Sequence, residues 1–330
     1  MKQREFIVLL GSATAAWPLP ARAQQAEGAR RVGVLMARKA DDPQEQKQFG
    51  ALRQGLLERV WSEEKTLHIE TRWTVADAAE ALKFARELIA LKAEALVANG
   101  TPSLVAVREP TSTIPTVFVS VADPVGQGFV PSLARPGGNI TGFSAEEAGM
   151  GGKWLELLKE LAPRVRRIAV IYNPETAPYA PMFFPAMQAA APGMAVALAI
   201  SKVYTRGDIE RVIAEIGREQ GGGLIVVPDS FTFGQRQRIT TLAAKYRLPA
   251  MYPLGTFIPD GGLVAYGIDR VDMFHRAADY VDRILRGTSP VELPVQQPTK
   301  FEFAINLKTA KALGLSVPPS MMLSADQVIE

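Results

Sequence analysis

The stretch ADPVGQGFVPSLARPGGNITGFS, residues 122–144, decides the fold of this chain. It follows the apolar run TVFVSV, residues 116–121, which is typical of a buried strand. Its prolines limit the backbone freedom of the loop, and its glycines permit turns with positive φ. A catalytic loop, a phosphate cradle and a hinge between two lobes are all compatible with such a segment, so the flanking patterns must distinguish them.

Strand-like and helix-like patterns alternate before this stretch. Strands are predicted at residues 31–36, 67–73, 95–100 and 116–121, and helices at residues 49–60 and 78–89. Alternation of this kind predicts βαβ units with right-handed connections and a parallel sheet.

The same alternation restarts after the stretch. Helices are predicted at residues 154–161, 209–216 and 235–246, and strands at residues 167–173, 223–229, 249–254 and 262–267. Thr205 and Asp208 have the spacing of a capping box for the second of these helices. Three strands recur in the same order, beginning near Val32, Ala95 and Thr116 and again near Ile168, Gly223 and Pro249. The sequence therefore predicts an α/β protein with two similar lobes.

Residues 1–23 are expected to be a secretory signal peptide. They combine a basic start, an apolar run over residues 6–17 and the cleavage signal Ala21-Arg22-Ala23. The apolar run is shorter than the roughly 20 residues that a membrane span requires. We therefore expect export and cleavage after Ala23, by either the Sec or the twin-arginine route.

The composition argues against several kinds of chemistry. The chain has no Cys, which excludes disulfides, thiol nucleophiles and Cys-based metal sites. His68 and His275 lack metal-ligand spacing and are expected to be surface or packing residues. There is no Walker loop, no dinucleotide-binding glycine fingerprint and no G-x-S-x-G elbow. We expect no cofactor, no metal and no enzymatic activity, with a mechanism based only on carboxylates as the alternative.

The charge balance argues against nucleic acid as a partner. The net charge is only +3 at pH 7 for 330 residues. A two-lobe regulator of the LacI type would also need a DNA-binding helix-turn-helix at the N-terminus, where the signal peptide stands.

Open α/β sheets bind ligands beyond the carboxyl ends of their strands. In this chain those positions hold small polar groups, single carboxylates and aromatic rings: Arg38, Lys39, Thr101, Pro102, Ser103, Asp123, Asn173, Asp229, Ser230 and Tyr252. Two such rims facing each other would form a cleft that closes on a small molecule.

Several long blocks resemble the ABC-transporter substrate-binding proteins of the tryptophan/tyrosine-binding type. They are DPVGQGFVPSLARPGGNITGFS at residues 123–144, GGLVAYGID at 261–269, residues 277–315 and ADQVIE at 325–330. The resemblance covers nearly the whole chain after the signal peptide. It implies a type I periplasmic-binding-protein fold, in which two Rossmann-like lobes with parallel-sheet cores are joined by three crossover segments.

The resemblance also implies a domain division and a function. The Gly/Pro stretch would be the first crossover, and residues 135–138 would turn the chain toward lobe two. Lobe one would comprise residues 30–142 and 268–290, and lobe two residues 143–267 and 291–330. The protein would be a monomeric periplasmic receptor that binds an amino-acid-like or aromatic solute and delivers it to the membrane permease of an ABC importer.

By position, the resemblance implies which residues contact the solute. Thr101, Pro102 and Ser103 match a turn at a helix N-terminus, which either binds a carboxylate through its N–H groups or only caps the helix. Asp229 matches an acidic position and is favoured as the partner of an ammonium group.

Two further carboxylates have two interpretations each. Asp123 either binds an ammonium group or caps the following turn, and Asp269 either reaches the solute or caps the helix at residues 272–285. Neutral contacts are expected from Tyr172, Asn173, Ser230 and Tyr252, the last placed to stack on a ring.

The loop ARKADDPQEQ, residues 37–46, departs from the family pattern. It carries Arg38 and Lys39, whereas relatives that bind amino acids tend to have a less charged loop there. A cationic rim would favour an acid that lacks an amino group, or the two side chains are simply solvated surface charges. The alternative function is an exported α/β enzyme that works through Asp123 and Asp229.

Overall fold

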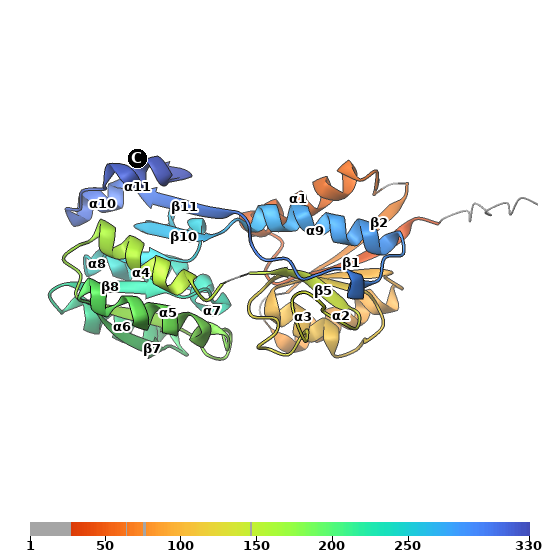
Figure 1. Cartoon of the computed structure of the whole chain (residues 1–330), viewed down its shortest axis with the longest axis horizontal. Coiled ribbons are helices and arrows are strands. Elements are labelled where there is room, and N and C mark those ends of the chain that lie inside the picture. The colour runs from red at the N-terminus through yellow and green to blue at the C-terminus, as the bar shows by residue number, and fades with distance from the viewer. Residues whose placement is uncertain (1–27, 64, 75–76, 146) are drawn as a thin grey trace, which may run out of the picture.

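The computed structural model describes residues 28–63, 65–74, 77–145 and 147–330, and these form two lobes side by side (Figure 1). The predicted signal peptide and its cleavage site lie outside the described residues. Within the described part of the chain, no helix combines the length and apolar character needed to cross a membrane.

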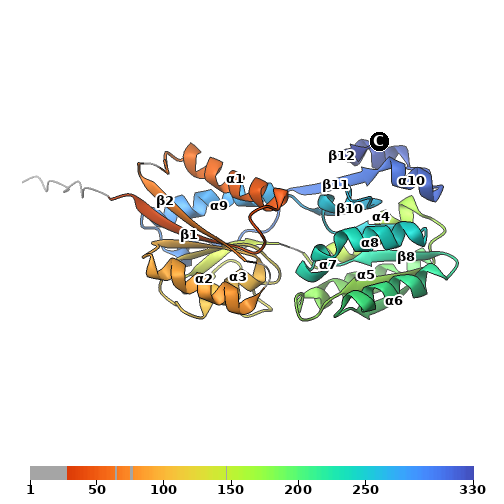
Figure 2. The same cartoon turned by 180° about the vertical axis from the view of Figure 1, so that it is seen from behind.

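Lobe one contains a five-stranded parallel sheet in the order β2-β1-β3-β4-β5. Its strands are β1 Arg30–Met36, β2 Leu67–Trp73, β3 Ala95–Asn99, β4 Thr116–Val121 and β5 Ile140–Ser144. One face is covered by α1 Pro43–Glu58 and α9 Arg270–Leu285, and the other by α2 Ala78–Ala90 and α3 Gly100–Arg108 (Figures 1 and 2). Because both faces are covered, the central strands β3 and β4 are buried along their whole length.

Lobe two contains a seven-stranded sheet in the order β12-β11-β10-β9-β8-β6-β7, parallel except where β10 meets β11. Its strands are β6 Arg167–Tyr172, β7 Ala197–Lys202, β8 Gly222–Val226, β9 Ala250–Tyr252, β10 Val264–Ile268, β11 Phe301–Asn306 and β12 Gln327–Ile329. Its helices are α4 Met150–Leu161, α5 Phe184–Ala190, α6 Arg206–Gly217, α7 Ser230–Gly234, α8 Arg236–Lys245, α10 Leu307–Leu313 and α11 Pro319–Ser324. The pair α4 and α5 covers one face, and α6 and α8 cover the other (Figures 1 and 2).

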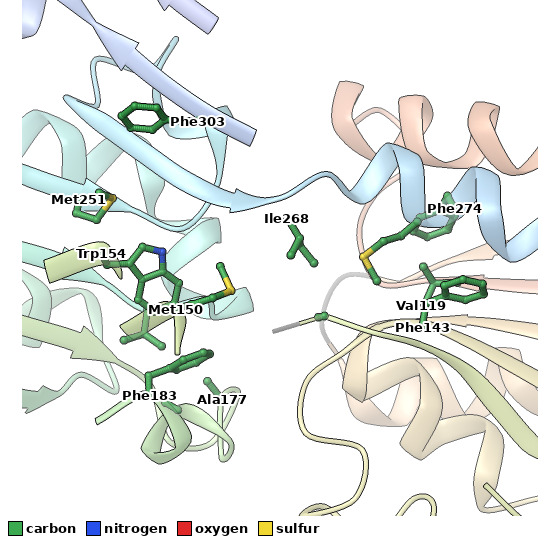
Figure 3. Packing of buried hydrophobic residues seen from close by; sticks show 14 of the residues in the cluster. Val119, Phe143, Met150, Trp154, Ala177, Phe183, Met251, Ile268, Phe274 and Phe303 are labelled. Carbon is green, nitrogen blue, oxygen red and sulfur yellow. The ribbon is translucent and has the colours of Figure 1, made fainter. Parts of the chain in front are cut away.

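Each lobe has its own buried core. In lobe two the Trp154 ring lies 4.9 Å from the Phe183 ring, and its Nε1–H donates to the carbonyl of Tyr266 at 2.7 Å. Figure 3 shows side chains of a third hydrophobic cluster, which has members in both lobes, with Ile268 on the connecting segment between them. Each lobe thus has a core of its own, and one cluster continues from lobe to lobe.

The α/β alternation and the capping box are confirmed. The Thr205 Oγ1 accepts from the N–H of Asp208, and the Asp208 carboxylate accepts from the N–H of Thr205 at the start of α6. The strands β5, β7, β11 and β12 were not predicted. The last three are partly exposed strands near the sheet edges, so they lack the compact apolar runs of the central strands.

The prediction for the first crossing was wrong in position. Residues 135–138 do not lead to lobe two, because β5 follows them and pairs with β4 in lobe one. Gly142 allows this close pairing: its φ is +154°, and a Cβ there would lie 2.0 Å from the carbonyl oxygen of Phe118. The chain crosses only after Ser144. The expected boundary at 142/143 therefore falls inside β5.

The other two crossings lie next to each other. After α9 the chain runs beside β5, where the Gln296 N–H donates to the carbonyl of Gly142 and its carbonyl accepts from the N–H of Ser144, both at 2.9 Å. The second and third crossings meet where the Asp269 N–H donates to the carbonyl of Lys300 at 3.0 Å. We propose that lobe one comprises residues 28–144 and 269–297, because the expected boundary at 290/291 falls inside a short helix that packs on β5.

Candidate functional site

The carboxyl ends of strands from both sheets meet at a cavity between the lobes. It has a volume of about 60 Å³ and is lined by residues that follow β1, β3, β6, β8, β9 and β10 and by one residue each of β3 and β4. A larger cavity of about 340 Å³ adjoins it along the crossing segments. Arg38, Leu254 and Arg270 line both cavities, which we call the cleft cavity and the hinge cavity.

The wall from lobe one offers hydrogen-bond donors. Gly100 and Thr101 begin α3, whose first turn has no side-chain cap because the Asn99 amide donates instead to Glu45 at 2.9 Å. Beside it lies Ser120, which is 8% exposed and has no partner for its hydroxyl among the described residues. Ser120 has a φ of +61°, a conformation that costs a non-glycine residue free energy and is found preferentially at functional sites.

The wall from lobe two is organised by Asp229. Its carboxylate accepts from the N–H groups of Asn173 at 3.0 Å, Phe231 at 3.0 Å and Thr232 at 3.3 Å, and from the hydroxyl of Thr176. Burial raises the pKa of Asp229, and the four donors act in the opposite direction. Asp229 thus caps α7 and ties the end of β6 to the end of β8, which leaves its acceptor positions filled.

Replacing Asp229 by Asn should destabilise the protein by about 2 kcal/mol, since an amide leaves buried N–H groups without an acceptor. Affinity of the folded protein for a ligand of the cleft cavity should change less than about threefold. Urea unfolding and calorimetric titration measure the two effects. Asp260→Asn, which removes an ion pair with Arg236 outside both cavities, is the control and should cost less than about 1 kcal/mol. An Asp229→Asn variant of normal stability that no longer binds solute would restore the ammonium role.

Arg38 connects the two lobes. Its Nη1 lies 3.2 Å from the Glu45 carboxylate in lobe one, and its guanidinium carbon lies 3.7 Å from the centre of the Phe233 ring in lobe two. Burial lowers the pKa of Arg38 to about 10, and the charge of Glu45 opposes this shift. Burial likewise raises the pKa of Glu45, which is only 1% exposed. Arg38 is therefore a partly buried cleft residue and not a solvated surface charge.

Four of the predicted contact residues line the cleft cavity: Thr101, Pro102, Asp229 and Ser230. Asp269 lines the hinge cavity, where it caps α9 and its carboxylate lies 2.8 Å from Lys300 Nζ. Although burial pushes the pKa of Asp269 upward, Lys300 brings it below its ordinary value.

The other predicted contacts lie away from the cavity surface. Asp123 caps a turn by accepting from the Gly126 N–H at 2.9 Å, and Ser103 is fully buried. Tyr252 is buried and stacked on Phe257 at 4.7 Å, with its pKa raised by burial, so it is not available to a solute ring.

Tyr172 packs against Phe184, and Asn173 is held by Asp229 and by the Glu175 N–H. Both side chains therefore support the wall from lobe two instead of forming its surface.

Sequence reasoning missed most of the wall. The missed residues are Glu45, Asn99, Gly100, Ser120, Thr176, Tyr179, Thr232, Phe233, Pro253, Leu254, Phe257 and Arg270. Ser120 was detectable in principle, because it sits at a strand end, whereas Glu45 and Thr176 come from segments whose position depends on the tertiary fold. No cluster of three or more His, Asp or Glu that could hold a metal occurs among the residues that the structure describes.

Comparison with known proteins extends these observations. A family model described as ABC transporter substrate binding protein matches residues 33–329. A tyrosine-binding protein of Clostridioides difficile is 27% identical over 245 residues, which is 74% of this chain and 68% of that protein.

Solved structures share the fold over nearly the full length. A conserved domain protein from Vibrio cholerae has a TM-score of 0.83 at 26% identity, covering 91% of this chain and 100% of the other. The ABC domain from Streptococcus pneumonia, solved in complex with L-Trp, has a TM-score of 0.82 at 22% identity, covering 92% of this chain and 100% of the other.

Proposed function

The chain belongs to the ABC transporter substrate binding protein family, and we propose that it is the solute-binding component of an ABC import system. It binds a small amino-acid-like or aromatic solute in the cleft cavity, between the two lobes. The solute is then presented to a membrane permease, and no covalent chemistry takes place.

One observation carries this proposal: the uncapped start of α3 lies beside the buried, unpartnered hydroxyl of Ser120 at the same cavity. Backbone N–H groups at a helix N-terminus, together with a hydroxyl, form a site for a carboxylate. A buried polar group without a partner is costly, so this wall is built for a ligand that supplies an acceptor.

The relatives favour an aromatic solute. One is named as a tyrosine-binding protein, and another was solved with L-Trp. The cleft cavity of this chain is lined by Phe233, Tyr179 and Phe257, which supply apolar surface for a ring. The present volume of about 60 Å³ is too small for such a solute, so binding requires the lobes to separate or Arg38 to move.

The alternative, an exported enzyme that works through Asp123 and Asp229, is disfavoured by geometry. Asp123 lines neither cavity, and the carboxylate of Asp229 already accepts four hydrogen bonds. The two groups therefore do not form a pair around a common substrate position.

A thermal-shift screen of the purified protein tests the receptor. Amino acids, aromatic acids, nucleosides and short carboxylates are added in turn, and a solute that binds only the folded state raises the melting temperature by mass action. We expect a saturable rise with one class of aromatic carboxylates or amino acids, and unchanged compound recovered afterwards. Recovery of an altered compound would instead identify an enzyme.

Export to the periplasm belongs to the same proposal. Expression of the full chain in a Gram-negative host, followed by fractionation and N-terminal sequencing, should give a periplasmic product that begins at Gln24. Retention of the intact chain in the cytoplasm would contradict it.

Replacing Ser120 by Gly should raise stability and lower affinity at the same time. Glycine adopts the observed φ of +61° without strain, so the free energy of unfolding should rise by about 1 kcal/mol. Loss of the hydroxyl should weaken solute binding roughly tenfold. Unfolding by urea and calorimetric titration give the two numbers.

The matched control is Ser120→Ala, which removes the hydroxyl and keeps the strained backbone. It should show the same loss of affinity with a smaller gain in stability, because it removes the unpaired hydroxyl and leaves the strained φ unchanged. Normal affinity in both variants would show that the Ser120 hydroxyl has no part in the site.

A further inference from the structure

The carboxylates of the cleft cavity are already occupied, which bears on the charge of the solute. Only Glu45 and Asp229 bring a carboxylate to the described lining of this cavity. Asp229 accepts four hydrogen bonds from its own lobe. Glu45 is buried and pairs with Arg38 at 3.2 Å and with the Asn99 amide at 2.9 Å. An ammonium group entering this cavity would therefore have to compete with groups of the protein.

Donors, in contrast, are in surplus. Arg38 carries five N–H donors, but among the described residues only Glu45 accepts a hydrogen bond from it. Its guanidinium carbon lies 3.7 Å from the centre of the Phe233 ring, and Arg38 lines both cavities together with Arg270, a second cationic side chain. The first turn of α3 and the hydroxyl of Ser120 add further donors from lobe one, the lobe that also carries Arg38. A ligand that supplies hydrogen-bond acceptors, such as a carboxylate, would therefore complement the cleft cavity.

The hinge cavity also offers few free carboxylates for an ammonium group. Its carboxylates are Asp269, Glu302 and Asp326, and its cationic side chains are Arg38, Lys47, Arg270 and Lys300. Asp269 is paired with Lys300, and Asp326 accepts from the Phe303 N–H at 2.8 Å. Glu302 is the acidic group that an ammonium could reach, and Lys47 and Lys300 already face it with positive charge. If the solute does carry an ammonium group, Glu302 is therefore the residue that would bind it.

Resting on the proposed receptor function, we propose that the preferred solute is an organic acid without an ammonium group. An arylalkanoate fits best: its carboxylate meets the surplus donors, and its ring meets the aromatic lining. A zwitterionic amino acid would carry the same carboxylate but would bury an ammonium group without a free carboxylate partner, which is unfavourable. Arg38, which lines both cavities and keeps unused N–H donors, is the source of this preference.

Matched pairs of compounds test this on the unmodified protein. Calorimetric titration at pH 7 compares 3-phenylpropanoate with L-phenylalanine, 3-(4-hydroxyphenyl)propanoate with L-tyrosine, and 3-(indol-3-yl)propanoate with L-tryptophan. A fourth pair, 4-methylpentanoate with L-leucine, separates the effect of charge from that of the ring. We expect each acid that binds to bind at least tenfold more tightly than its amino acid.

The outcomes are distinct. Equal or tighter binding of the amino acids would overturn the charge inference and leave the receptor standing. Absence of binding by every member of the panel would overturn both the inference and the proposed solute class. Loss of amino-acid binding in Glu302→Gln would identify Glu302 as the ammonium partner, and would also overturn the inference.

Variants locate the donors. The Arg38→Gln replacement is made in a protein that already carries Glu45→Gln, so that no buried carboxylate is left unpaired. This double variant is compared with the Glu45→Gln single variant. The double variant should bind the acid at least tenfold more weakly than Glu45→Gln alone. The control is Arg236→Gln, since Arg236 also lies over Phe233, at 4.7 Å, but lines neither cavity, and it should stay within about twofold. An unchanged preference for acids in the double variant would show that Arg38 does not set it.

Discussion

Replacing Arg38 by Met should destabilise the protein by about 3 kcal/mol at pH 8, and a further Glu45→Gln replacement should recover most of that loss. Removing one partner of a buried ion pair leaves an uncompensated charge, which costs several kcal/mol. The figure is kept at the lower end because the Arg38 side chain is 18% exposed, whereas Glu45 is 1% exposed.

The cost should also depend on pH. Burial already raises the pKa of Glu45 in the presence of Arg38, and without Arg38 it should rise further. A carboxyl with a raised pKa in the folded state binds its proton more tightly there than in the unfolded chain. The stability that protonated Glu45 gives the folded state is therefore fully present below the ordinary pKa of a glutamate, about 4.3. It is lost as pH rises through the raised pKa. The Arg38→Met variant should lose less stability at pH 5 than at pH 8.

Urea unfolding of the wild type, both single variants and the double variant, at both pH values, forms the double-mutant cycle. Additive effects of the two replacements, or a cost that does not change with pH, would contradict a buried Arg38–Glu45 pair.

Replacing Gly142 by Ala should destabilise lobe one by more than about 3 kcal/mol. The φ of +154° is unfavourable for an L-residue, and the new Cβ would lie 2.0 Å from the carbonyl oxygen and 2.6 Å from the nitrogen of Phe118. Because both atoms belong to the backbone of β4, the clash can be relieved only by moving β5. The Gln296 segment, which bonds to Gly142, would move with it and disturb the third crossing.

Gly138→Ala is the matched control in the same stretch. Gly138 also has a positive φ, of +60°, but a Cβ there would meet no atom within 4 Å. This replacement should cost only about 1 kcal/mol. Thermal and urea unfolding of both variants measure the difference. Equal costs would show that the conformation of Gly142, and not its contact with β4, limits the substitution.

The sequence alone determined the features that depend on neighbours along the chain. Apolar periodicity predicted the central strands and most helices, and Thr205 with Asp208 predicted the start of α6. Long family-like blocks predicted the two-lobe fold. These signals are local, since a strand, a helix face or a cap is specified within a few residues.

Only the tertiary structure decided how those elements are used. Asp229 was expected to face an ammonium group, but Thr176 and Asn173, more than 50 positions away, fill its acceptor positions. Arg38 was expected either to be a solvated surface charge or to form part of a cationic rim. In the structure it lies between Glu45 and Phe233, which places it in the cleft.

The first crossing moved for the same reason. Residues 140–144 form a strand only because β4 lies close enough to pair with them. Gly142 permits this close approach, but a single glycine in the sequence does not predict it. Hydrogen-bond occupancy, burial of charge and strand pairing are properties of distances in space. They become defined only when segments remote in sequence are packed together.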